Sequence, residues 1–255
     1  LSATIVMPEW ASISKQQATE GYGGEVILFG QSVTESIDKA KEIARGGKVL
    51  IHPYDDADVM AGQGTIGLEI LEDLPDPDMI LVPVGGGGLI GGIASAVKAL
   101  RPQTKVTGVQ TAACPSARVS LEKGAPTRVP AQKSIADGIA VKRVSERTLS
   151  YARTYVDEVV TVDEETIARA VLILLERHKT LAEGAAAAPL AALLAGRVAL
   201  DGPTVLLVSG GNIDSSRLDD IIGRVLAADG RRVRLQEVMP DVPGQLHRLT
   251  GVLAE

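Results

Sequence analysis

Short apolar runs alternate along the chain with longer segments whose apolar residues recur at the helical period. Short runs indicate strands and the helical period indicates helices, so both kinds of element can be placed. Strands are expected at residues 3–7, 26–29, 49–51, 79–84, 106–109, 159–162 and 204–208. Helices are expected at residues 11–22, 34–45, 58–74, 89–100, 164–181, 185–194 and 214–228. The alternation predicts an α/β protein with an open, mostly parallel sheet and flanking helices.

A second pattern follows residue 230. Val233, Leu235 and Val238 alternate with polar residues, which predicts one more strand. A turn at 240–244 then precedes a helix that begins at Gln245.

Composition narrows the class of protein. The 255 residues include one Phe, one Trp and four Tyr, so small aliphatic side chains must form the core. A net charge of −6 with so few aromatics argues against nucleic acid as a partner. The single cysteine, Cys114, excludes an internal disulfide framework, and no cluster has zinc-ligand spacing. We therefore expect a cytoplasmic protein of one large or two modest domains.

Residues 79–97 form an uncharged stretch that is long enough to suggest a membrane span. Six of these residues are Gly and one is Pro. Each Gly inside a helix costs about 1 kcal/mol relative to Ala, so a spanning helix is not expected. No membrane partner and no secretory signal are predicted.

The strongest chemical signal is a loop of four glycines, Gly85, Gly86, Gly87 and Gly88, followed by Leu89. It runs from an apolar strand into a helix, so free backbone N–H groups and the positive end of the helix converge on one small volume. This arrangement predicts binding of a phosphate. The alternative is a flexible turn, which would not require the entropy cost of four consecutive glycines.

Two nucleotide interpretations of this loop are weaker. Gly86, Gly88 and Gly91 satisfy the spacing of a dinucleotide-binding loop, but the next strand ends in Gln110 instead of the carboxylate that would bind a ribose. The glycines are also not followed by the lysine of a triphosphate-binding loop.

A second candidate element, Ser209, Gly210, Gly211 and Asn212, also follows an apolar strand. Ligands of open α/β sheets bind at the carboxyl ends of the strands, where both loops would lie. The two glycines would let a flat ligand approach the backbone beside the Ser209 hydroxyl. An ordinary strand-to-helix turn is the alternative.

Several motifs, taken in order, resemble threonine dehydratase, also called threonine ammonia-lyase. They are Ala3–Pro8, Ile51–Asp56, Ala61–Glu69, Pro83–Leu89, Ala136–Gly138 and Ser209–Asn212. The resemblance covers essentially the whole chain. It implies a fold-type II pyridoxal-phosphate enzyme, similar in fold to the β subunit of tryptophan synthase.

The resemblance also implies an activity and a site. Such enzymes use pyridoxal 5′-phosphate to deaminate L-threonine to 2-oxobutanoate and L-serine to pyruvate. Residues Gly85 to Leu89 would hold the cofactor phosphate, and Ser209 with Gly210 would lie at the pyridine ring. Glu183 would lie near the cofactor, although Gly184 replaces the proline usual after it. The alternative for Glu183 is an acid that stabilises a helix N-terminus.

The family's Schiff-base lysine segment, Ser-Phe-Lys, does not occur in this sequence. Lys15 is expected to be a solvated helix residue, and none of the ten lysines has the setting of a catalytic nucleophile. We therefore predict no catalytic residue in the chain, and an inactive, N-terminally truncated fragment.

Metal and histidine chemistry are not expected. Serine racemase, a close relative, binds a divalent metal through acids just after the strand that corresponds to 106–109, where this chain has Gln110 and Ser116. This favours a dehydratase. His52, His178 and His247 are expected to be structural or solvated.

The C-terminal pattern resembles the opening of an ACT regulatory domain, with a terminal hairpin as the alternative. The predicted domains are therefore 1–52, the remainder of a small domain; 53–230, the large cofactor domain; and 231–255, the incomplete ACT-like start. An amino-acid effector and a homo-oligomer of the full-length protein are also expected.

Two other functions stay open at this point. One is another fold-type II enzyme, such as serine racemase, serine dehydratase or threonine synthase. The other is a non-catalytic protein on the same scaffold that senses an amino acid or a phosphate compound.

Overall fold

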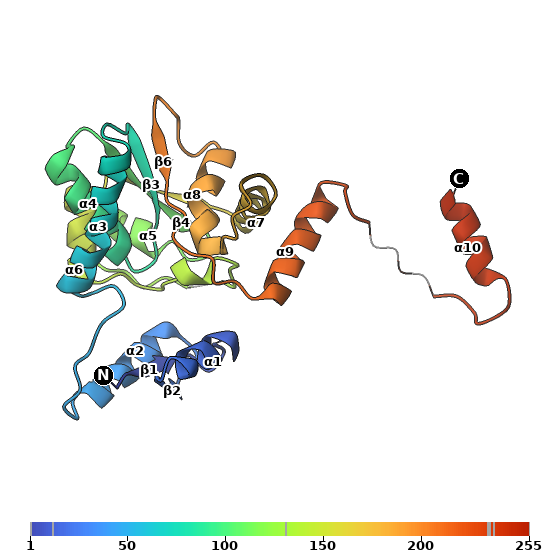
Figure 1. The fold of residues 1–255 in the computed structure, drawn as a ribbon, viewed down its shortest axis with the longest axis horizontal. Helices are drawn as coiled ribbons and strands as arrows, with labels where there is room; N and C mark the ends of the chain where they lie inside the picture. Colours follow the sequence, from blue (N-terminus) through green and yellow to red (C-terminus); the bar gives the residue numbers. More distant parts are fainter. Residues whose placement is uncertain (1, 12, 131, 234–235, 237, 255) are drawn as a thin grey trace.

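The computed structural model describes the chain except for residues 1, 12, 131, 234–235, 237 and 255. In Figure 1 a small unit that contains the N-terminus lies below a larger unit. The small unit pairs β1 (Thr4–Met7) with β2 (Glu25–Leu28) in parallel. Its helices are α1 (Ile13–Gly21) and α2 (Val33–Ala44).

The large unit is built on a four-stranded sheet in the order β5-β4-β3-β6. Its strands are β3 (Met79–Pro83), β4 (Lys105–Thr111), β5 (Glu158–Val162) and β6 (Thr204–Leu206), and every pair is parallel. The carboxyl ends of all four strands therefore point the same way.

Helices cover both faces of this sheet (Figure 1). One layer contains α3 (Ala57–Asp73), α4 (Gly88–Leu100), α5 (Ser116–Lys123) and α6 (Glu146–Tyr155). The other contains α7 (Glu164–Ile173), α8 (Gly184–Leu194) and α9 (Ser215–Ala228), and α10 (Gln245–Ala254) lies apart near the C-terminus.

The central strand β3 separates two hydrophobic cores. Met79 and Leu81 pack with α7, α8 and α9, whereas Ile80 and Val82 pack with α4 and α6. This alternation follows from the period of two in a strand, and both faces are apolar because both are covered. Leu81 and Ile80 are fully buried.

Helix starts agree with local chemistry. The Asp163 side chain accepts a hydrogen bond from the Thr166 amide at 2.8 Å and caps α7. Ser145 and Thr148 form a reciprocal capping box at the start of α6.

Two sequence predictions about the elements are wrong. Residues 49–51 form no strand, and the side chains of Val49 and Ile51 are exposed because no neighbouring strand pairs with them. The predicted helix 164–181 ends as α-helix at Ile173 and continues as the π-helical turn η2 (Leu174–His178). Lys179 then adopts a left-handed conformation with φ of 57°, which ends the helix before residue 181.

Two helices, α5 and α6, were not predicted, and the expected strand 204–208 is shorter at its end. The strand predicted around 233–238 includes residues 234, 235 and 237, which lie outside the described residues. The helix after Gln245 is confirmed. Within the described residues, no helix is both long and apolar enough to cross a membrane.

Candidate active site

A cavity of about 540 Å³ opens between the small unit and the carboxyl ends of the large sheet. The four-glycine loop, the loop that contains Ser209 and the residue Glu183 all line it. The side chains of Trp10 and Tyr54 contribute to its wall from the N-terminal part of the chain. The topology thus brings together, from three separate segments, all the predicted site residues except Gly210, which follows Ser209 but does not line the cavity.

The glycine loop joins β3 to α4 through Gly87, which has a φ of 93°. Such a left-handed conformation strongly favours glycine. The first N–H groups of a helix have no carbonyl one turn earlier, and α4 has no side-chain cap. For Gly86, Gly87, Gly88 and Leu89, the described residues supply no backbone carbonyl as acceptor. These amides can therefore donate to an anion.

The loop also has no room for side chains, because Tyr54 lies directly against it. A Cβ on Gly86 would lie 2.4 Å from the Tyr54 ring, and a Cβ on Gly88 would lie 2.8 Å from the Tyr54 carbonyl oxygen. The Tyr54 ring in turn meets His52 edge to face, with 4.6 Å between ring centroids. Glycine is therefore required here by close approach as well as by backbone conformation.

Ser209 follows β6, which pairs with β3, so the Ser209 loop and the glycine loop leave neighbouring strands at the same edge of the sheet. The next residue, Gly210, accepts a hydrogen bond from the Glu183 amide at 3.0 Å. A Cβ on Gly210 would lie 2.8 Å from Glu183 Oε1, and one on Gly211 would lie 2.5 Å from the Leu181 carbonyl oxygen. The two glycines thus let the segment before α8 pack directly on the Ser209 loop.

Glu183 is the N-cap residue of α8, but its side chain makes no capping hydrogen bond. Burial raises the pKa of Glu183, the nearby positive charge of Lys15 lowers it, and the negative charge of Asp137 raises it. Glu183 therefore lies at a helix N-terminus, which agrees with the interpretation of a helix-stabilising acid. It also lines the cavity, which agrees with the position that the resemblance implies.

Lys15 lies on helix α1 and is partly exposed, as predicted for a helix residue. It also lines the cavity, and its charge acts on Glu183, which the sequence did not indicate. The fold places Lys15 of the small unit on the same cavity as the loops of the large sheet, which the local sequence around Lys15 does not indicate. Trp10 and Arg217, which also line the cavity, were likewise not singled out from the sequence.

Gln110 and Ser116 have internal partners. Gln110 is fully buried, and its Oε1 accepts from the amides of Ala117 and Arg118 at 3.1 and 3.3 Å. The Ser116 hydroxyl donates to the Val141 carbonyl at 2.5 Å. Both side chains thus hold α5 and the loop beside it, and no group of three or more acidic, histidine or cysteine residues suited to a metal occurs within the described part of the chain.

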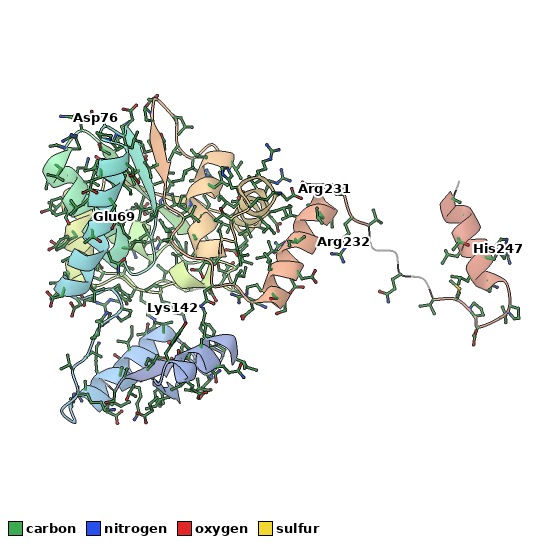
Figure 2. The ribbon with its side chains drawn as sticks, viewed as in Figure 1. Glu69, Asp76, Lys142, Arg231, Arg232 and His247 are labelled. Atoms are coloured by element: carbon green, nitrogen blue, oxygen red, sulfur yellow. The ribbon has the colours of Figure 1, made fainter. Side chains whose placement is uncertain are left out.

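The histidines lie in different settings. His52 Nδ1 accepts hydrogen bonds from the amides of Tyr54 and Asp55, and burial lowers its pKa. His52 therefore shapes the turn that carries Tyr54. His178 is exposed at the end of η2, and Figure 2 shows His247 on α10, away from the cavity.

Comparison with known proteins decides the family. The model of the family described as pyridoxal-phosphate dependent enzyme matches residues 1–211. The chain belongs to this family. The cofactor of this family is pyridoxal phosphate, and the predicted resemblance and fold class are confirmed.

Two relatives of this pyridoxal-phosphate dependent family illustrate the similarity. An L-threonine ammonia-lyase of Geobacter sulfurreducens is 49% identical over 255 residues, which are 99% of this chain and 63% of that protein. An L-threonine ammonia-lyase of Thermotoga maritima is 47% identical, over 100% of this chain and 64% of that protein. The chain thus spans less than two thirds of the length of these relatives.

Solved structures agree with this result. A threonine deaminase from Solanum lycopersicum, in its processed form, superposes with a TM-score of 0.82 and 32% identity, covering 89% of this chain and 63% of that one. A maize serine racemase superposes with a TM-score of 0.80 and 32% identity, covering 90% and 72%.

The residues of the cavity fit the cofactor of the family. The glycine loop lines the cavity and offers backbone amides that have no backbone carbonyl acceptor among the described residues, which suits a phosphate. Ser209 offers a neutral hydroxyl on the same cavity.

Proposed function

We propose that this chain is the cofactor-holding part of an L-threonine ammonia-lyase, which deaminates L-threonine to 2-oxobutanoate and ammonia and also L-serine to pyruvate. The observation that carries the proposal is the meeting of the glycine loop, Ser209 and Glu183 on one cavity. Near-half identity to two L-threonine ammonia-lyases supports this substrate class.

The protein's own residues would act by binding and orientation. The amides of Gly85 to Leu89 and the positive end of α4 would bind the cofactor phosphate. Ser209, with Gly210 next to it, would lie at the pyridine ring, and the Ser209 hydroxyl would hydrogen-bond the pyridine nitrogen. Bound pyridoxal phosphate supplies an electron sink for cleavage of bonds at the amino-acid α-carbon.

Ser209 also bears on the type of reaction. A neutral hydroxyl does not fix a proton and a positive charge on the pyridine nitrogen, as an aspartate would. A cofactor held by Ser209 in this way would be a weaker electron sink, which would suit β-elimination. Gln110 and Ser116 are bound internally, which supports a dehydratase in preference to a metal-dependent serine racemase.

The wider organisation belongs to the same proposal. Residues 1–52 and 53–230 would form the small domain and the large cofactor domain, and residues 231–255 would begin an ACT-like domain that binds an amino-acid effector. The full-length protein would be a cytoplasmic homo-oligomer. Because the family's Ser-Phe-Lys segment does not occur in this sequence, this chain alone would hold the cofactor without a covalent bond and would be inactive.

The direct test is an assay of the gene product that contains this chain. Formation of 2-oxobutanoate from L-threonine is expected to exceed any racemisation of L-serine. Racemisation as the main activity would favour the serine racemase alternative, and ligand binding with no turnover would favour the sensor.

Substitution of Ser209 by alanine in that gene product is expected to lower the kcat for L-threonine by about tenfold, because the loss of one hydrogen bond to the ring costs roughly 1–1.5 kcal/mol. The melting temperature is expected to stay unchanged, since Ser209 lies on a loop. Steady-state kinetics check this. Unchanged kinetics would show that Ser209 is not the partner of the ring nitrogen.

A further inference from the structure

One wall of the cavity is formed by residues 135–141, which include the short 3₁₀ helix η1 (Asp137–Ile139). This segment touches the glycine loop, because a Cβ on Gly85 would lie 3.1 Å from the Gly138 carbonyl oxygen. It also touches the Glu183 region, because a Cβ on Gly138 would lie 3.3 Å from Ala185 Cβ and 3.6 Å from Glu183 Oε1. The wall therefore fills the space between the two predicted binding elements.

The beginning of this wall is anchored by Glu164 on the first turn of α7. Glu164 Oε1 accepts from the Ser134 hydroxyl at 2.7 Å and from the Thr111 hydroxyl at 2.8 Å. Its Oε2 accepts from the Ile135 amide at 2.6 Å. These charge-assisted bonds fix the segment just before η1 to β4 and α7.

The centre of the wall is anchored by Arg217 on the first turn of α9. Arg217 Nη1 donates to Asp137 Oδ2 at 2.7 Å, and both side chains are partly buried. The helix α9 follows directly from the loop that contains Ser209. The ion pair thus ties the cavity wall to the third binding element.

The charge of this pair also matters at the cavity. Asp137 faces Glu183, whose carboxylate is half-buried, and the cavity is lined as well by Lys15 and Asp214. Arg217 offsets the negative charge of Asp137 next to Glu183. Removal of the guanidinium would leave the charge of Asp137 without its ion-pair partner beside a second carboxylate, and the repulsion would favour movement of the wall away from Glu183.

We propose that Arg217 is a positioning residue for the cofactor: through Asp137 it holds the wall 135–141 against the glycine loop and Glu183, while its guanidinium does not touch the cofactor. This inference rests on the proposed function. The Arg217–Asp137 ion pair would fix the distance between the glycine loop and Ser209. Neither the glycine loop nor the Ser209 loop can do this by itself.

The first measurement needs no cofactor. Hydrogen exchange is followed at the amides of Ile139 and Ala140, which donate to the carbonyls of Ala136 and Asp137 and close η1. In Arg217→Met these two amides are expected to exchange about fivefold faster, the effect of losing a half-exposed ion pair of roughly 1 kcal/mol. The Ile135 amide, which Glu164 holds, is expected to keep its rate.

A matched control lies on the same helix. Arg224 pairs with Glu165 on the surface, away from the cavity. Arg224→Met removes an equivalent cation from α9 and is expected to leave the exchange of Ile139 and Ala140 unchanged. Equal exchange rates in Arg217→Met and the wild type would show that Arg217 does not hold the wall 135–141.

The second measurement uses pyridoxal phosphate itself. Trp10 is the single tryptophan and lines the cavity, so quenching of its fluorescence reports binding. Arg217→Met is expected to bind about fivefold more weakly, and Arg224→Met as the wild type does. Two further variants keep a pair of opposite charges: Arg217→Lys, and the double variant Asp137→Arg with Arg217→Asp. Both are expected to recover most of the affinity.

The outcomes separate the two claims. Faster exchange with unchanged affinity would overturn the positioning role, and failure of the exchanged pair to recover affinity would also contradict it. A wild-type chain that binds no pyridoxal phosphate would contradict the proposed function and the role toward the cofactor. The exchange rates would still decide whether Arg217 holds the wall.

Discussion

Replacement of Gly88 by alanine is expected to weaken the binding of pyridoxal phosphate by about tenfold to a hundredfold. The new Cβ would lie 2.8 Å from the Tyr54 carbonyl oxygen and 2.9 Å from Tyr54 Cα, so backbone must shift at the phosphate cradle. A shift that breaks one hydrogen bond to a charged group costs roughly 1.5–3 kcal/mol, which gives the stated range. Titration of the variant with the cofactor measures the change.

Gly62→Ala is the matched control for this substitution. Gly62 lies on the exposed side of α3, and nothing lies within 4 Å of the position of its Cβ. Its cofactor affinity is expected to equal that of the wild type. Equal affinity in Gly88→Ala, with the fold retained in a melting curve, would show that this loop is not the phosphate cradle.

Replacement of Gly92 by alanine is expected to lower the free energy of unfolding by about 3 kcal/mol. Gly92 lies where α4 crosses α3, and its Cβ would lie 2.2 Å from the Met60 carbonyl oxygen and 2.9 Å from the Gly64 nitrogen. Both neighbours are backbone atoms, so the helices must separate. The gain in helix propensity, about 1 kcal/mol, does not offset this cost. Urea unfolding measures the difference.

Gly62→Ala serves as a control here too, because it adds the same methyl group to the same helix pair. It is expected to stabilise the protein by roughly 0.5–1 kcal/mol, since alanine restricts the unfolded chain and meets no clash. If Gly92→Ala also stabilised the protein, the close contact of α3 and α4 would be wrong.

The parallel sheet could be predicted from the sequence because its strands are buried on both faces. In β3, all five residues from Met79 to Pro83 are buried, which produces a continuous apolar run. The run at 49–51 shares this composition but lacks a partner strand, and Val49 is 91% exposed. A short apolar run alone does not reveal whether a neighbouring strand exists.

Helices α5 and α6, which the sequence pattern did not predict, have few buried apolar residues at the helical period. Helix α6 buries only Thr148, Leu149 and Ala152 among ten residues, so its apolar period is faint. The capping box of Ser145 and Thr148 has Thr in place of the usual Glu or Gln, so the motif does not mark the helix start in the sequence. Recognising side-chain caps of this kind would have marked the start of the helix.

The candidate site divides in the same way. The glycine loop and the Ser209 loop could be predicted, because backbone amides and close approach require glycine in the local sequence. Tyr54 and Asp137 fell within motifs of the resemblance, but their contacts did not follow from it. Arg217 and Lys15 reach the cavity through packing of α9 and α1 on distant segments, which no local pattern encodes.

This chain alone is expected to form a cradle for pyridoxal phosphate, from the glycine loop and the Ser209 loop. The most direct measurement is a fluorescence titration of the chain with the cofactor, followed by borohydride reduction and determination of the protein mass. Saturable binding of one cofactor per chain is expected, with no pyridoxyl-lysine after reduction. Absence of saturable binding, or a stoichiometric pyridoxyl-lysine at Lys15 or any other lysine, would contradict this expectation.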